Sequence, residues 1–355
     1  MNDPAELKEF AALHARNQDI SGYERLLGRI GSDDPDRPDA WVRVWSEAAA
    51  EHEAAGRLLD ACRHYNMARF PYVDGPARQA ALERCVDAFD RWRGDRGIER
   101  IDLEVDGARV GAWAAGLSAD DPKPLVVVMG GIVSIKEQWA PAMAGLRRLG
   151  MAAVVTELPG VGENTLRYTP DGHRMLSAVV DAVAGRADTA RTYALAFSFG
   201  GHLALRCAAD DPRIRGVVTA GAPVHDFFTD TEWHGRVPQV TVDTLAHLTG
   251  TKPEDVLGSL GDWALPAERL AALSVPVHYM ASARDEIIPP GETAFLRRHV
   301  RDLDLLRHDD VHGSPGHVAE TRLWTAWSLL RMRGELPVQR AVLGALLRAR
   351  RALGR

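Results

Sequence analysis

The first ninety residues carry their hydrophobic positions at helical spacing. From Pro4 to about Trp92, apolar side chains recur three and four positions apart, which places them on one face of an amphipathic helix. The clearest stripe consists of Trp41, Val44, Trp45, Ala48 and Ala49. The stretches DPDRP and FPYVDGP interrupt the pattern as loops. We therefore predict an all-helical N-terminal cap domain over residues 1–98.

The pattern changes after the stretch RGDRG. The segment IERIDLEVDGARVGAWAAGL contains two alternating runs around Asp106 and Gly107, which predicts a β-hairpin. Farther on, the apolar runs PLVVVM, MAAVVT, TYALAF, IRGVVTA, VPVHYMASA and LDLLRH are separated by amphipathic segments such as KEQWAPAMAGLRRLG. Apolar strands alternating with helices indicate a mostly parallel sheet covered on both faces. Residues 99–334 are thus predicted to form an α/β domain with an antiparallel start.

Two further segments complete this organisation. Residues 222–273 lie between two predicted strands and are longer than a simple crossover requires, so we expect a partly helical insertion near the site. Residues 335–355 combine arginines with an apolar stripe and predict a C-terminal helix that packs on the core or on a second copy, with a helix on a membrane surface as the alternative.

The composition and charge of the chain argue against several classes of partner and cofactor. The chain has 355 residues, of which 46% are hydrophobic, and a net charge of −6 with both signs mixed along its length. No basic face for nucleic acid is indicated. The three cysteines lack C-x-x-C spacing, so we expect no disulfide framework and no metal. Without a signal-peptide pattern or a run of 18 apolar residues, we expect a cytoplasmic protein that does not enter the membrane.

A serine stands where a predicted strand meets a predicted helix. The stretch YALAFSFGGHLAL places Ser198 within Ala196-Phe197-Ser198-Phe199-Gly200. This is the G-x-S-x-G elbow of α/β-hydrolases with alanine at the first glycine. Ser198 is therefore a candidate nucleophile, with a small turn residue as the alternative.

A serine nucleophile requires an acid and a histidine, which follow in this order in α/β-hydrolases. Asp285 comes directly after the strand VPVHYMASA, and the loop after LDLLRH holds His312 and His317. We favour His312 as the base because Ser314-Pro315 looks like the start of a helix, which would place His317 in its first turn as a structural or substrate-contacting group.

An anionic intermediate also needs hydrogen-bond donors. We expect the backbone N–H groups of Phe199 and Gly131 to supply them, because one follows the nucleophile and the other lies in the loop after PLVVVM. Glu163, His225 and Asp226 follow predicted strands, at whose carboxyl ends ligands bind in open α/β sheets. We predict that they contact substrate, with solvated loop charges and helix caps as the alternative.

The stretches VVVMGGIVSIKEQW and LRRLGMAAVVTELPGVGE carry a more specific pattern. It resembles the signature of α/β-hydrolases related to 2,6-dihydroxypseudooxynicotine hydrolase, the fungal chain-shortening hydrolases of naphthopyrone biosynthesis and the fermentation-respiration switch protein family. The residues that match it are Gly130, Gly131, Ser134, Lys136, Glu137, Pro159, Gly160, Gly162 and Glu163.

The resemblance implies a cofactor-independent serine hydrolase with a Ser-His-Asp mechanism, a site between the helical region and the core, and a homodimer. Its substrate would be a polyketide-like or aromatic small molecule, cleaved at an ester bond or at a C–C bond beside a ketone. Two alternatives stay open. The same residues could drive a lyase that eliminates an acyloxy group such as acetate, or the chain could be a non-catalytic binding or regulatory protein.

Overall fold

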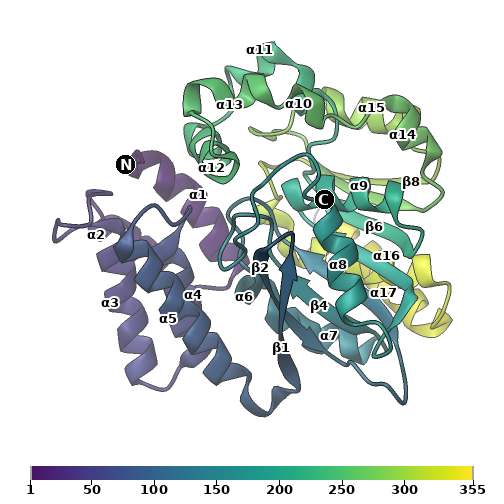
Figure 1. Cartoon of the computed structure of the whole chain (residues 1–355), viewed down its shortest axis with the longest axis horizontal. Helices are drawn as coiled ribbons and strands as arrows, with labels where there is room; N and C mark the ends of the chain where they lie inside the picture. Colours follow the sequence, from purple (N-terminus) through teal and green to yellow (C-terminus); the bar gives the residue numbers. More distant parts are fainter. Residues whose placement is uncertain (1, 354–355) are drawn as a thin grey trace.

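The structure is a computed structural model and describes residues 2–353. Eight strands form one sheet beside a group of N-terminal helices (Figure 1). The strands are β1 (Ile98–Val105), β2 (Ala108–Ala115), β3 (Pro124–Met129), β4 (Ala152–Thr156), β5 (Asp188–Ala196), β6 (Ile214–Ala220), β7 (Val277–Ser282) and β8 (Leu303–His308). Their order is β1-β2-β4-β3-β5-β6-β7-β8. The pairs β1/β2 and β2/β4 are antiparallel and the other neighbours are parallel, which confirms the predicted α/β fold.

The predicted hairpin is present at the start of the sheet. Asp106 and Gly107 have positive φ angles of 51° and 77°, as a two-residue turn of type I′ requires. Val105 pairs with Ala108 across this turn. The hairpin sets β2 against β4, so the parallel part of the sheet begins one strand later.

Helices cover both faces of the sheet, as Figure 1 shows. On one face, α8 (Arg174–Ala182) and α9 (Phe199–Asp210) contact β5, and α15 (Gly291–His299) follows β7. On the other, α7 (Met143–Arg148) contacts β4, and α16 (Val318–Arg333) contacts β6 and α17 (Pro337–Leu353). This arrangement buries the apolar strands on both sides, which explains why β3 and β4 are buried along their whole length.

The N-terminal helices lie beside the sheet in purple and blue in Figure 1. They are α1 (Pro4–Asn17), α2 (Tyr23–Arg29), α3 (Trp41–Ala54), α4 (Leu58–Arg69) and α5 (Pro76–Arg93), followed by the 3₁₀ turn η1 (Gly94–Arg96). Trp41 and Trp45 are fully buried in a hydrophobic cluster of these helices, as the predicted stripe requires. Phe89 of α5 packs on Trp113 of β2, with ring centroids 5.0 Å apart. The helices therefore share buried surface with the sheet.

Between β6 and β7 the chain forms a series of short helices that Figure 1 shows at the top of the molecule. They are α10 (Asp226–Thr229), α11 (Thr231–His234), α12 (Gln239–Thr249), α13 (Pro253–Ser259), η3 (Gly261–Trp263) and α14 (Ala267–Ala272). The backbone N–H of Val240 in α12 donates to Glu6 Oε2 of α1 at 3.0 Å. This segment thus meets the N-terminal helices.

Two expected helices differ from the structure. KEQWAPAMAGLRRLG is broken into α6 (Lys136–Trp139), the 3₁₀ turn η2 (Ala140–Ala142) and α7, because Pro141 has no N–H for a continuous helix. The final helix does not start at Pro315: a 3₁₀ turn, η4 (Pro315–His317), comes first, and Ser314 has a φ of 50°. Within residues 2–353, no helix is both long and apolar enough to cross a membrane.

Candidate active site

Ser198 lies at the sharp turn between β5 and α9. Its φ of 52° and ψ of −131° are rare for a residue with a side chain. A Cβ atom at Gly200 would lie 2.3 Å from the carbonyl oxygen of Gly130, and one at Gly201 would lie 2.0 Å from Thr219 Oγ1. Glycine is thus required at both positions, whereas the alanine at 196 is buried without conflict. The turn presents the serine hydroxyl at the carboxyl end of the sheet.

The structure brings three of the predicted residues together. His312 Nε2 lies 3.1 Å from Ser198 Oγ, and His312 Nδ1 lies 3.0 Å and 2.9 Å from the two carboxylate oxygens of Asp285. Asp285 Oδ1 also accepts hydrogen bonds from the N–H groups of Ile287 and Ile288. Because the carboxylate can only accept, it favours the tautomer with the proton on Nδ1. The lone pair of Nε2 then faces the serine hydroxyl, as a general base requires.

The residues around His312 influence its pKa and hold its ring in place. Burial opposes protonation of the ring, but the charge and hydrogen bond of Asp285, aided by Glu286, raise the pKa of His312 above its usual value. Glu286 also accepts the backbone N–H of His312 at 3.0 Å. A Cβ at Gly221, whose φ is +58°, would lie 2.7 Å from the imidazole. Neither Glu286 nor Gly221 was identified from the sequence, although a glycine directly after a strand was an available signal.

Two residues with unpaired backbone N–H groups lie beside Ser198. Gly131 and Phe199 line the cavity around Ser198, and among the described residues their N–H groups donate to no protein acceptor. A Cβ at Gly131 would lie 2.9 Å from Ser198 Cβ, so only glycine lets this turn approach the serine. The arrangement can hold an oxygen that gains negative charge next to Ser198.

A cavity of about 840 Å³ opens at Ser198 and His312. Its walls come from α1, α4, the turn after β3, α7 and α16. The lining residues from the N-terminal helices include Phe10, Leu13, His14, Gln18, Leu59, Asn66 and Phe70. Burial, together with Arg69 and His312, lowers the pKa of His14 to about 4, so this ring is neutral at physiological pH. None of these lining residues was identified from the sequence, because α1 comes next to the core only in the folded structure.

Four residues that we expected to contact substrate do not line this cavity. Glu163 pairs with Arg100 and Lys136. The ring of His225 stacks on Phe295 with centroids 4.0 Å apart, and Asp226 begins α10 beside Gly291. His317 stacks on His308 instead of facing Ser198. None of the four thus lies on the wall of the cavity at Ser198, and their contact with substrate stays a prediction.

His308, His317 and Glu320 are close enough for a metal within the described part of the chain, with ligand atoms inside 4.8 Å. The two rings, however, are stacked at 4.1 Å and 8°, so their in-plane lone pairs do not converge on one point. Arg351 also pairs with Glu320 at 2.7 Å. The group fits a stacked histidine pair better than a metal centre.

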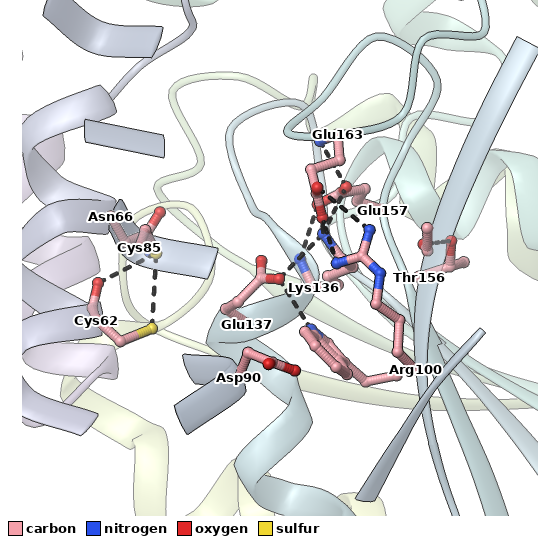
Figure 2. Close-up of polar contacts among 12 residues, drawn as sticks. Cys62, Asn66, Cys85, Asp90, Arg100, Lys136, Glu137, Thr156, Glu157 and Glu163 are labelled. Atoms are coloured by element: carbon pink, nitrogen blue, oxygen red, sulfur yellow. Dashed lines mark hydrogen bonds and ion pairs between the residues drawn. The ribbon is translucent and has the colours of Figure 1, made fainter. Parts of the chain in front are cut away.

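Three of the signature residues, Lys136, Glu137 and Glu163, form an ion cluster with Glu157 and Arg100, which Figure 2 shows. Lys136 Nζ lies 3.0 Å from Glu137, 3.1 Å from Glu157 and 2.7 Å from Glu163, and Arg100 pairs with Glu163. Burial opposes the charge of Lys136, yet the three carboxylates raise its pKa well above the usual range. Burial likewise opposes the charge of Glu163, but Lys136 and Arg100 lower its pKa to about 2. The cluster joins the turn after β3 to the loop after β4.

Comparison with known proteins places the chain in a family. Residues 39–270 match the family described as Esterase FrsA-like. The chain is 26% identical to Esterase FrsA of Vibrio cholerae serotype O1 over 288 residues, covering 75% of this chain and 68% of that protein. It is 27% identical to Esterase FrsA of Citrobacter koseri over 335 residues, covering 86% and 79%.

Solved structures agree with the fold. The chain is 54% identical to the protein titled AbyA5 Wildtype, with a TM-score of 0.95 and coverage of 98% of this chain and 99% of that one. It also resembles 2,6-dihydroxy-pseudo-oxynicotine hydrolase, with a TM-score of 0.73 at 21% identity and coverage of 89% and 94%, a likeness of fold alone. The family match and the α/β-hydrolase fold together identify an enzyme of the hydrolase class, and the chain belongs to the FrsA-like esterase family.

Proposed function

We propose that the chain is a cofactor-independent serine hydrolase in which Ser198 is the nucleophile, His312 the general base and Asp285 the group that orients it. The observation that carries the proposal is the continuous contact from Asp285 through His312 to Ser198, with 2.9 Å and 3.1 Å for its two hydrogen bonds. A serine hydroxyl becomes a competent nucleophile when such a base accepts its proton.

The reaction on an ester proceeds in two halves. Ser198 Oγ attacks the carbonyl carbon while its proton passes to His312 Nε2, and the carbonyl oxygen becomes an oxyanion that the N–H groups of Gly131 and Phe199 stabilise. Collapse breaks the bond to the leaving alkoxide, which takes the proton from His312 and leaves an acyl-serine. Water, deprotonated by His312, then attacks the acyl carbon, and return of the proton to Ser198 releases the acid.

The substrate in this proposal is a fairly large, mostly apolar ester or ketone of polyketide-like or aromatic character. The support is the size of the cavity and the apolar residues that line it. The N-terminal helices contribute Phe10, Leu59 and Phe70 to these walls, so they serve as a cap that supplies part of the pocket. The homodimer implied by the resemblance is a proposal that light scattering of the purified chain tests.

Elimination is a second candidate. The same imidazole faces a largely apolar cavity lined by Gly131 and Phe199. In its neutral form it could remove an acidic C–H beside a carbonyl while the two backbone N–H groups hold the enolate. Loss of an acyloxy group such as acetate would then follow, with His312 carrying the removed proton and no water consumed. In this reaction Ser198 only positions the substrate.

The test combines labelling with a variant. We expect a fluorophosphonate to attach to Ser198 in the wild type and to leave Ser198→Ala unmodified, as read by intact mass and peptide mapping. Ser198→Ala should lower turnover by about a thousandfold or more, and rapid quenching should trap an acyl-enzyme. A much milder loss with no trapped acyl-enzyme would support elimination, and wild-type turnover in Ser198→Ala would refute the nucleophile.

A further inference from the structure

Arg69, the last residue of α4, is a buried arginine whose hydrogen-bond partners are all neutral. It is 1% exposed. Nε and Nη2 donate to Asn66 Oδ1 at 2.9 Å and 2.7 Å, Nη1 donates to the carbonyl of Pro71 at 3.1 Å, and Nη2 also donates to the carbonyl of Val133. Among residues 2–353 no carboxylate lies within ion-pair distance of it. A buried cation without a counter-ion is costly, so packing alone does not explain this residue.

The partner Val133 belongs to the turn that carries a proposed oxyanion donor. The N–H of Ser134 donates to the carbonyl of Gly131 at 3.1 Å, which closes the turn. The peptide group between Val133 and Ser134 is thus held on both sides: its oxygen accepts from Arg69, and its N–H donates to Gly131. Hydrogen bonds in such a chain polarise and strengthen one another. The position of Gly131 beside Ser198 depends on this peptide.

The core holds the other end of the same segment. The backbone N–H of Lys136 donates to Glu157 Oε2 at 3.1 Å, and Glu157 Oε1 accepts from Lys136 Nζ and from the N–H of Glu163. These residues form the ion cluster of Figure 2, where Asn66, the partner of Arg69, is drawn on the neighbouring helix. The turn is therefore held by the sheet domain at residue 136 and by the N-terminal helices at residue 133.

We propose that Arg69 is a positioning residue for the reaction: by holding the carbonyl of Val133 it keeps the N–H of Gly131 directed at the oxygen that becomes negatively charged. This inference rests on the proposed function and extends it, because it makes the N-terminal helices necessary for catalysis on any substrate, including those too small to contact the walls of the cavity. A misplaced oxyanion donor lowers the turnover number more than it weakens the binding of substrate.

The experiment uses p-nitrophenyl acetate, which reaches Ser198 without filling the cavity. We expect Arg69→Gln to lower kcat by about tenfold to a hundredfold, with KM changed by less than about threefold. Arg69→Lys, which keeps the charge but not the planar set of donors, should be intermediate. Binding of a trifluoromethyl ketone, whose adduct with serine carries an oxyanion, should weaken by a factor similar to the loss in kcat.

Arg78 supplies the matched control. It is also a buried arginine of the N-terminal helices, but it contacts Asp33, Asp74 and the carbonyl of Phe70 and not the turn. Arg78→Gln should lower the melting temperature while the folded enzyme keeps its kcat and its ketone affinity.

Arg69 would lose its proposed role if Arg69→Gln lowered kcat no more than Arg78→Gln, or if ketone affinity did not follow kcat. Fluorophosphonate labelling of the wild type separates this result from a failure of the proposed function. Labelled Ser198 with unchanged Arg69→Gln kinetics would overturn this inference alone, whereas an unlabelled wild type would overturn both.

Discussion

At the scale of single residues, two histidines were candidates for the base, and only one of them lies within hydrogen-bond distance of Ser198. His312 lies between Ser198 and Asp285. The ring of His317 is stacked on His308 and has Glu320 at 3.8 Å. His312 thus has the geometry expected of the base. His317 does not line the cavity, and its contact with substrate stays a prediction.

Replacing each histidine separately tests the difference. We expect His312→Gln to lower kcat by about a thousandfold or more, because triad groups act as a unit. His317→Gln should change kcat/KM by less than about tenfold, since it acts only through the packing of the loop. Steady-state kinetics on one ester, with circular dichroism as a folding control, decide the matter. Equal losses in the two variants would contradict the assignment.

The charge environment of His312 predicts a pH dependence. The base must be neutral to accept the serine proton, so activity falls as pH drops through its pKa. Because Asp285 raises that pKa above the ordinary value of 6.5, the acid limb of kcat/KM should have its midpoint above pH 6.5. Glu286→Gln removes a smaller charge contribution and should shift this midpoint to lower pH while keeping most of the maximal rate. A midpoint that does not move in this variant would contradict the electrostatic account.

At the scale of elements, the segment after β3 shows how charge and chain breaks act together. Pro141 interrupts the helix that the apolar spacing predicts. Lys136, the first residue of the short α6, belongs to the ion cluster. The side chains of Lys136, Glu137 and Glu157 are fully buried. Removing the cation leaves carboxylates buried without their partner, which is far more costly than losing a surface pair.

Lys136→Met should therefore lower the free energy of unfolding by about 3–5 kcal/mol. The control is Arg191→Met, which removes ion pairs of an arginine that is 46% exposed and should cost less than about 1 kcal/mol. Urea unfolding followed by circular dichroism measures both. Similar losses in the two variants would show that the cluster does not stabilise the fold.

At the scale of the whole molecule, the N-terminal helices and the sheet share one hydrophobic cluster. Cys62, Tyr65 and Phe89 of the helices belong to the same buried cluster as Trp113 and the central strands. The helices also line the cavity through residues such as Phe10 and Asn66. The N-terminal helices are thus part of both the buried core and the wall of the cavity.

A chain that begins near Gly97 should therefore be poorly soluble, because it exposes Trp113 and its neighbours to water. Any soluble fraction should be inactive on large esters. The full-length variant Phe10→Ala is the control: it should raise KM for a long-chain p-nitrophenyl ester and leave p-nitrophenyl acetate unaffected. Soluble yield and turnover of the two esters are the measurements, and full activity of the shortened chain on the large ester would rule out the cap role.

Local sequence was sufficient for much of the fold. The spacing of apolar residues predicted the N-terminal helices and the strands, and Asp106-Gly107 predicted the hairpin, because these patterns reflect contacts within a few residues. The elbow around Ser198 was also local, since a sharp strand-to-helix turn needs small residues next to it. The order of serine, aspartate and histidine narrowed the candidate site to a few side chains.

Tertiary structure decided which of several similar residues meet. Only the packing of β8 and α16 brings His312 rather than His317 to Ser198, 114 positions away. Glu163 lies in an ion cluster instead of the cavity, and Arg69 reaches the turn after β3 across 64 positions. The spacing of residues along the chain does not predict such contacts. They depend on how elements distant in sequence pack, and there burial and pairing determine which polar groups face the cavity and which are held within the protein.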